Sequence, residues 1–184
     1  MKINDILKLS MTMLGLSGQD ELTDQGISAE ADESVKEALE SLLTCANLAY
    51  EEVCTEYFPL KEQVLVKDGY CDLSKLDFQI CGVLSCEDSF SKTVAYRILD
   101  NTIQFDTNNP VVLTLCKIPK KFGFGEQIDT LLPVRVLAYG TVREFHFMRG
   151  ESDEALLYDN RFKGSLENFI RKKIAPLQAR RWNK

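Results

Sequence analysis

The sequence predicts an α+β fold: a helical bundle with a small antiparallel β-domain inserted between its helices, followed by an extended basic C-terminal tail. Two observations carry this prediction. In both the first and the last third of the chain, apolar residues recur with the three-to-four-residue spacing of amphipathic helices. In the middle, short runs rich in β-branched and aromatic residues alternate with turn-forming residues, which is typical of strands.

The N-terminal part predicts two helices. Residues 3–15 carry an amphipathic pattern, and the acidic and polar residues 17–32 are expected to form a loop. Ser34 and Glu37 have the spacing of a capping box at the start of a longer helix. That helix keeps one apolar stripe and is expected to end just before Pro59, because proline cannot donate the backbone hydrogen bond that a helix interior needs.

The middle of the chain predicts a small antiparallel sheet or sandwich. Lys67-Asp68-Gly69 separates two strand-like runs, and these runs are expected to pair as a hairpin because Asp-Gly suits a tight turn. Asp100-Asn101 and residues 106–110 mark further turns. The predicted strands are residues 64–66, 70–73, 78–86, 93–99, 102–105 and 111–118.

The C-terminal part predicts two helices joined by a very short link. A helix is expected over 133–149, because proline suits its first turn and glycine follows its end. The next helix is expected to begin at Ser152 or Asp153 and to end by Pro176 at the latest. Such a short link favours a near-antiparallel pair, and Gly140 would let the partner helix approach closely.

These elements divide the chain into four expected parts without internal repeats or low-complexity tracts. They are N-terminal helices over 1–60, an inserted β-domain over 61–118, a helical pair over 119–175, and an extended docking tail over 176–184.

Charge is divided unevenly along the 184 residues. The chain has a formal net charge of −6, yet residues 161–184 hold eight Lys or Arg and a single acid, for a net charge of +7. Residues 1–160 hold 14 of the 22 bases and 27 of the 28 acids, for a net charge of −13. The split favours a C-terminal segment that docks into an acidic groove or onto phosphate; a solvated helix end is the alternative.

The sequence offers little for catalysis, so we expect a protein that is not an enzyme and that uses no cofactor. Six cysteines form no C-x-x-C pair and His146 is the single histidine, so no metal site is expected. The glycine-rich stretch 122–127 lacks the strand-to-helix context of a phosphate loop. The N-terminal residues are amphipathic and not continuously apolar, which predicts neither a signal peptide nor a membrane span, and places synthesis and assembly in the cytoplasm.

Three segments of the C-terminal part resemble the head–tail adaptor, or connector, proteins of tailed bacteriophages and prophages. They are PVRVLAYGTVREF at 133–145, DEALLYDNRF at 153–162 and ARRW at 179–182. The order of parts is also similar to the podophage tail-tubular A adaptors and to simpler siphophage connectors. The resemblance covers most of the chain in outline and is specific over 126–184, whereas the β insertion departs from the simplest siphophage form.

The resemblance implies a structural virion protein. Such proteins form a ring, typically a dodecamer, that joins the capsid portal to the next neck or tail protein, with DNA passing through the middle without sequence-specific binding. The C-terminal segment docks onto the portal. Arginine supplies bidentate contacts and tryptophan a large apolar anchor, so the expected docking residues are Arg171, Lys172, Lys173, Arg180, Arg181 and Trp182.

Four further residues are candidates for contacts within the ring or with the neck. Arg135 and Arg143 lie in the helix predicted over 133–149 and are expected to serve in packing or in ring contacts. Phe122 and Phe124 lie on a glycine-flanked loop, where they would either meet a neighbouring subunit or fold back onto the core.

Three other functions remain open. A stopper or tail-completion protein of the same neck would be dominated by a β-barrel. A cytoplasmic nucleic-acid-binding module would use the basic tail, although an acidic body repels a polyanion over a Debye length of about 8 Å. An enzyme of unknown class would show a deep polar pocket.

Overall fold

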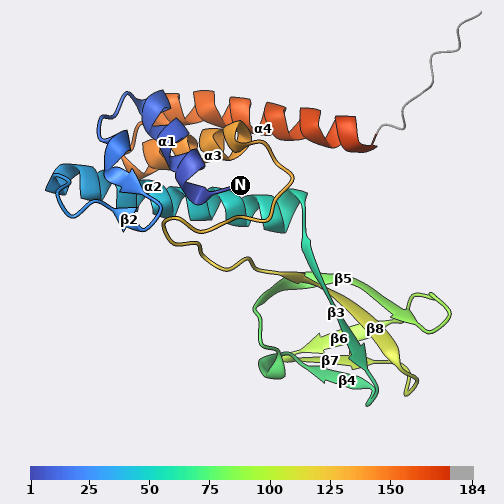
Figure 1. Ribbon diagram of the computed structural model, residues 1–184. Helices are drawn as coiled ribbons and strands as arrows, with labels where there is room; N and C mark the ends of the chain where they lie inside the picture. The colour runs from blue at the N-terminus through green and yellow to red at the C-terminus, as the bar shows by residue number, and fades with distance from the viewer. Residues whose placement is uncertain (175–184) are drawn as a thin grey trace, which may run out of the picture. The chain divides into compact units, whose positions relative to one another are not determined.

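The computed structural model describes residues 1–174, with side chains as far as Arg171. It confirms the predicted α+β class, because helices and small antiparallel sheets together make up the fold. The described chain divides into two compact units, drawn in Figure 1. The helical unit comprises Met1–Tyr50 and the described residues from Lys121 onward, and the strand unit comprises Glu51–Lys120.

The helical unit is built from the amphipathic segments expected from the sequence. A positive φ of 67° at Gly15 ends the first helix with a left-handed cap, as is common for glycine. The predicted capping box at Ser34 is wrong, since the second helix already begins at Glu33 and the Val35 amide donates to the Asp32 carbonyl at 3.0 Å. The helices are α1 (Ile3–Leu14), α2 (Glu33–Glu52), α3 (Val134–Met148) and α4 (Ser152–Ile174).

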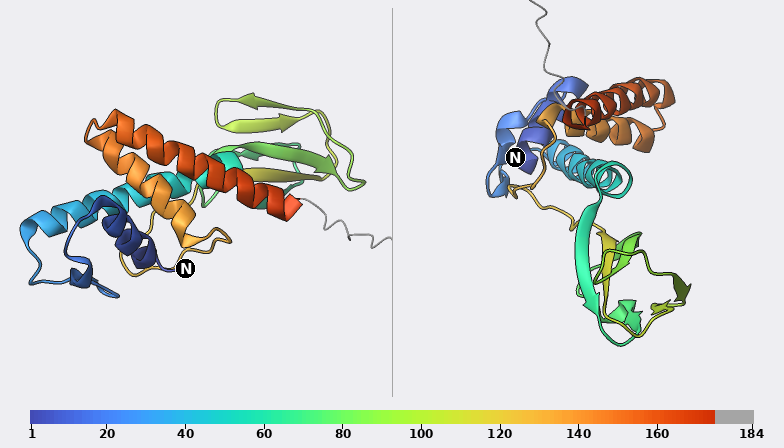
Figure 2. Two further views of the ribbon diagram at one scale, coloured as in Figure 1. Left: turned by 90° about the horizontal axis from the view of Figure 1, so that it is seen from above. Right: turned by 90° about the vertical axis from the view of Figure 1, so that its right-hand side faces the viewer.

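Helices α3 and α4 lie side by side as a tightly linked pair, as Figures 1 and 2 show. Gly140 of α3 is the point of closest approach. A Cβ atom there would lie 2.9 Å from the Cβ of Ala49 in α2 and 3.0 Å from the ring of Phe162 in α4. The packing of both helices against α3 therefore requires a glycine at position 140. The predicted role of Gly140 is therefore confirmed. Fully buried side chains of the unit include Ile3, Leu7, Met11, Leu39, Leu42, Leu137 and Phe162.

The acidic segment after α1 was expected to be a plain loop, and this is wrong in one respect. It contains a two-stranded ribbon, β1 (Leu22–Thr23) and β2 (Gly26–Ile27). The Thr23 hydroxyl donates to the Gly26 carbonyl at 2.8 Å, which closes the turn, and the Leu22 side chain is buried. The sequence did not predict this ribbon, because strands of two residues within a polar segment are too short to show an alternating pattern.

The strand unit contains two three-stranded antiparallel sheets, with strand orders β3-β8-β5 and β4-β7-β6. Before β3, α2 passes into a π-helical turn at Val53–Tyr57, and the helical structure ends before Pro59 as predicted. The strands are β3 (Leu60–Val66), β4 (Tyr70–Asp72), β5 (Ile80–Asp88), β6 (Tyr96–Leu99), β7 (Thr102–Phe105) and β8 (Val111–Lys117).

The hairpin predicted around Lys67-Asp68-Gly69 is wrong. β3 pairs with β8 and β4 pairs with β7, so this turn carries the chain from one sheet to the other. Gly69 does adopt a positive φ of 71°, but turn chemistry alone does not decide which strands pair. Pairing follows the shared core between the sheets, formed by Val66, Cys71, Cys86, Ile103, Phe105, Val111, Leu113 and Leu115.

Candidate functional site

The predicted portal-docking residues begin at the end of α4. Arg171 is exposed, and its guanidinium lies 3.4 Å from a carboxylate oxygen of Glu167, one turn earlier. An exposed pair of this kind holds the side chain weakly, so Arg171 stays accessible to a partner. The other predicted docking side chains, Lys172, Lys173, Arg180, Arg181 and Trp182, lie outside the side chains that the structure describes.

The loop that carries Phe122 is anchored to α2. The side-chain amide of Asn47 donates to the Phe122 carbonyl at 3.0 Å, and the Phe122 amide donates to the Asn47 side-chain oxygen at 2.7 Å. The Phe122 ring meets Tyr50 edge-on, with ring centroids 5.3 Å apart. Of the two expectations for Phe122, the described chain therefore takes the one in which the side chain folds back onto its own unit.

The same loop is held at its other end by α1. Phe124 is half-buried, and the amide of the next residue, Gly125, donates to Asn4 at 2.9 Å. The Asn4 amide in turn donates to the Thr23 carbonyl at 2.7 Å. Sequence reasoning missed Asn4, because a single buried polar residue in an amphipathic helix leaves no periodic signal. The loop over 121–130 is thus fixed by two asparagines from two different helices.

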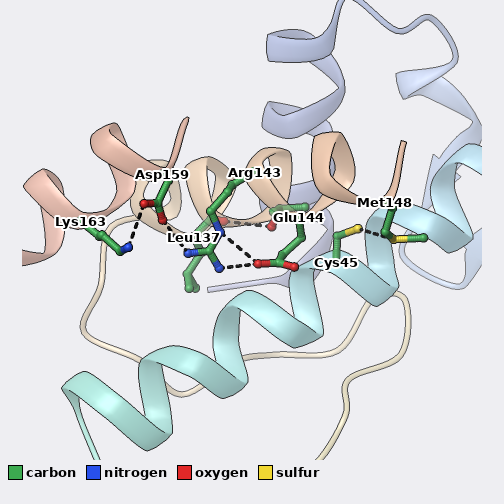
Figure 3. Close-up of polar contacts among 8 residues, drawn as sticks. Cys45, Leu137, Arg143, Glu144, Met148, Asp159 and Lys163 are labelled. Carbon is green, nitrogen blue, oxygen red and sulfur yellow. Dashed lines mark hydrogen bonds and ion pairs between the residues drawn. The ribbon is translucent and has the colours of Figure 1, made fainter. Parts of the chain in front are cut away.

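Arg143 is buried between α3 and α4, with only 6% of its side chain exposed. Its Nε donates to Glu144 at 3.0 Å and its Nη1 donates to Asp159 at 3.1 Å, as drawn in Figure 3. Lys163 lies 2.8 Å from the other Asp159 oxygen, and the Arg143 guanidinium lies over the Phe162 ring at 4.9 Å. The group ties the helical pair together.

Arg135, the second arginine expected in a contact, has a different environment. It is exposed near the start of α3, and its guanidinium lies 5.8 Å from the centroid of Tyr139, a cation–π distance. Of the two arginines, Arg135 is the one whose side chain is accessible on the described surface.

Asp159 is the carboxylate that joins these charges. Although burial alone would raise the pKa of its carboxyl, the contacts with Lys163 and Arg143 outweigh burial and hold the pKa below the ordinary value of 3.8. The carboxylate is therefore ionised at neutral pH and serves as the anion between two cations. This arrangement suits a structural ion-pair network and provides no general acid.

His146 is part of the packing beside the α3–α4 link. Its Nδ1 lies 2.6 Å from a carboxylate oxygen of Glu151, and its ring stacks on Tyr158 with centroids 5.7 Å apart. The nearby thiol of Cys45 contacts the sulfur of Met148 at 3.2 Å (Figure 3). Burial raises the pKa of the Cys45 thiol to about 12, so it carries almost no nucleophilic thiolate at neutral pH.

The strand unit also holds buried thiols. The pKa of the Cys116 thiol is raised to about 11. Burial is the largest cause, and the neighbouring Cys81 is the second. Within residues 1–174, no cluster of three or more His, Cys, Asp or Glu is placed to bind a metal ion. In the same range, no helix combines the length and the apolar composition needed to cross a membrane.

The surface of the described residues presents many large apolar side chains. In the strand unit, they gather on edge strands and loops. A faint sequence signal existed, since Tyr96-Arg97-Ile98-Leu99 does not alternate cleanly between apolar and polar residues. The exposed set comprises Leu65, Tyr70, Leu84, Phe90, Tyr96, Ile98 and Leu99 in the strand unit, and Leu48, Leu131, Phe147, Met148, Leu156 and Leu157 in the helical unit.

No family model matches this chain, and no curated protein matches it. Among the described side chains, Arg171 near the end of α4 and the apolar residues of the edge strands are exposed.

Proposed function

We propose that this protein is a structural component of a phage neck, a ring that joins the capsid portal to the next neck or tail protein. In this proposal the ring is made of copies of this chain, typically twelve, and DNA passes through it without sequence-specific binding. The protein is assembled in the host cytoplasm and resides in the virion. The resemblance of residues 126–184 to head–tail adaptors is the starting point.

Charge segregation is the observation that carries the proposal. A net charge of +7 in residues 161–184 stands against −13 in the rest of the chain. Because α4 spans Ser152–Ile174, the basic segment begins near the middle of this helix and continues into the residues beyond it. Arginine and tryptophan are enriched among interface hot spots, so an acidic groove on a portal protein is the partner this segment would fit.

The acidic body supports a role beside DNA. A wall of like charge does not retain a polyanion, so an acidic conduit would let DNA pass during ejection. The same charge disfavours the alternative of a nucleic-acid-binding module. The helix content of about 46% disfavours the alternative of a β-barrel stopper or tail-completion protein.

Portal docking is tested by co-sedimentation with the portal protein encoded in the same genome. The variant Arg180→Gln/Arg181→Gln/Trp182→Ala should lose portal binding and keep its fold, as judged by circular dichroism. The matched control is Lys120→Gln/Lys121→Gln, which removes the same two charges from an exposed loop and should bind normally. Equal binding by both variants would contradict docking through the tail.

A further inference from the structure

On strand β6, the side chains that share a face with the buried core are themselves exposed. Tyr96 pairs with Phe105 and Ile98 pairs with Ile103, and residues paired across antiparallel strands share a face of the sheet. Phe105 and Ile103 are buried, with 9% and 0% exposed, whereas Tyr96 and Ile98 are 39% and 56% exposed. Core-facing apolar side chains on β6 thus lack a cover among the described residues.

The backbone of β6 has a free edge as well. In the described chain β6 pairs only with β7, at one end of the order β4-β7-β6. Edge strands are commonly protected by charged side chains, proline or a bulge, and β6 carries one charged residue and no proline. Its charged residue is Arg97, which lies on the outer face beside Leu99, opposite to the face of Tyr96 and Ile98. An edge of this kind suits strand addition by another chain.

A receptive surface lies at the opposite edge of the same sheet. An open groove of about 340 Å³ runs between β3 and β4, with apolar lining from Val64, Leu65, Tyr70 and Leu76. Asp68 stands on its rim and is exposed. Lys75 also lines the groove, with its Nζ 3.6 Å from Asp72.

Charge and strand direction agree for a contact between these two surfaces. β4 and β6 are both antiparallel to β7, so they run in the same direction, and a sheet continued from one copy to the next would set β6 parallel to β4. In that orientation Arg97, early in β6, comes to the side of Asp68, just before β4.

We propose that β6 of one copy adds to β4 of a second copy and seats Tyr96 and Ile98 against the β3–β4 groove. The two surfaces differ and lie on opposite edges, so the contact is head-to-tail and can close into a ring. This inference names the self-association surface of the ring and rests on the proposed function for its biological role.

Charge reversal on the full-length protein tests the pairing. Arg97→Asp and Asp68→Arg should each weaken self-association at least about tenfold in sedimentation equilibrium, because each places like charges together. The double variant should recover the association of the parent. Ile98→Asp should also weaken it. Leu131→Asp, at an apolar site of the helical unit that is 75% exposed against 56% for Ile98, should not. The proposal would be overturned if the double variant did not recover self-association. It would also be overturned if Ile98→Asp and Leu131→Asp weakened self-association equally.

Cross-linking tests the direction of the contact. In a Cys81→Ser background, Arg97→Cys/Asp68→Cys places one thiol on each side of the contact, and mild oxidation should give a ladder of disulfide-linked multimers. A β6-to-β6 contact would instead give only dimers, already with Arg97→Cys alone, and would refute the head-to-tail arrangement. Rings that form on portals regardless of Ile98→Asp would refute this surface alone, whereas intact self-association without portal binding would refute the proposed function alone.

Discussion

Gly140 and Gly164 show at the scale of single residues how packing decides the effect of one methyl group. Both are helical glycines, but a Cβ at Gly140 would meet Ala49 and Phe162 at 2.9 and 3.0 Å, whereas nothing lies within 4 Å of a Cβ at Gly164. Gly140→Ala should therefore lower the free energy of unfolding by about 1–3 kcal/mol. Gly164→Ala should raise it by roughly 0.5–1 kcal/mol, as alanine favours helix. Urea unfolding of both variants checks the opposite signs; changes of the same sign would contradict the packing around Gly140.

Asp159 predicts how stability depends on pH. Its pKa is lower in the folded than in the unfolded protein, so its contribution is present at pH values above about 3.8 and is lost as the pH falls through the folded-state pKa. Asp159→Asn should thus be less stable than the parent at pH 7, with a difference that shrinks below about pH 4. Urea unfolding at pH 7, 5 and 3 measures this, and a difference independent of pH would count against the ion-pair network.

Residue environments were the least predictable part of the molecule. The sequence marks Arg143 as a charged residue on an amphipathic helix, but its burial depends on Asp159, 16 residues away on another helix. Likewise, Phe122 is held by Asn47, 75 residues earlier. Neither contact follows from local spacing, because side-chain partners are chosen by the tertiary fold.

At the scale of elements, the loop over 121–130 behaves as a part of the helical unit. Asn47→Ala removes both hydrogen bonds to the Phe122 backbone and should lower the free energy of unfolding by about 1–2 kcal/mol. The Phe122 amide should then exchange its hydrogen faster. The matched control is Asn160→Ala on the exposed face of α4, which should not lower stability. Unchanged amide exchange at Phe122 in Asn47→Ala would show that the loop is fixed by other contacts.

Helices were predictable from the sequence, whereas strand pairing was not. The period of the apolar residues in α3 and α4 depends only on nearby positions, so their bounds follow closely from proline and glycine positions. The partner of β3 is β8, which begins 51 residues after β3 begins. From the sequence alone, the tight turn after β3 fitted a hairpin between β3 and β4 as well as it fitted the observed pairing. The core shared by the two sheets favours the observed pairing.

At the scale of the whole molecule, charge segregation separates docking to protein from binding to nucleic acid. If the basic segment docks on a protein groove, the purified protein should not shift duplex DNA even at low salt, since a body with net charge −13 repels it. A nucleic-acid module would bind with an affinity that falls steeply as salt increases. An electrophoretic shift assay across a salt series measures this, and a salt-dependent shift would favour the nucleic-acid alternative.

The central claim is that copies of this chain assemble as a ring on a portal. The most direct measurement is the native mass of the purified protein alone and after co-sedimentation with the portal protein. We predict a stoichiometric ring on the portal, with assembly that depends on Arg180, Arg181 and Trp182. A stable small oligomer that does not bind the portal would contradict it.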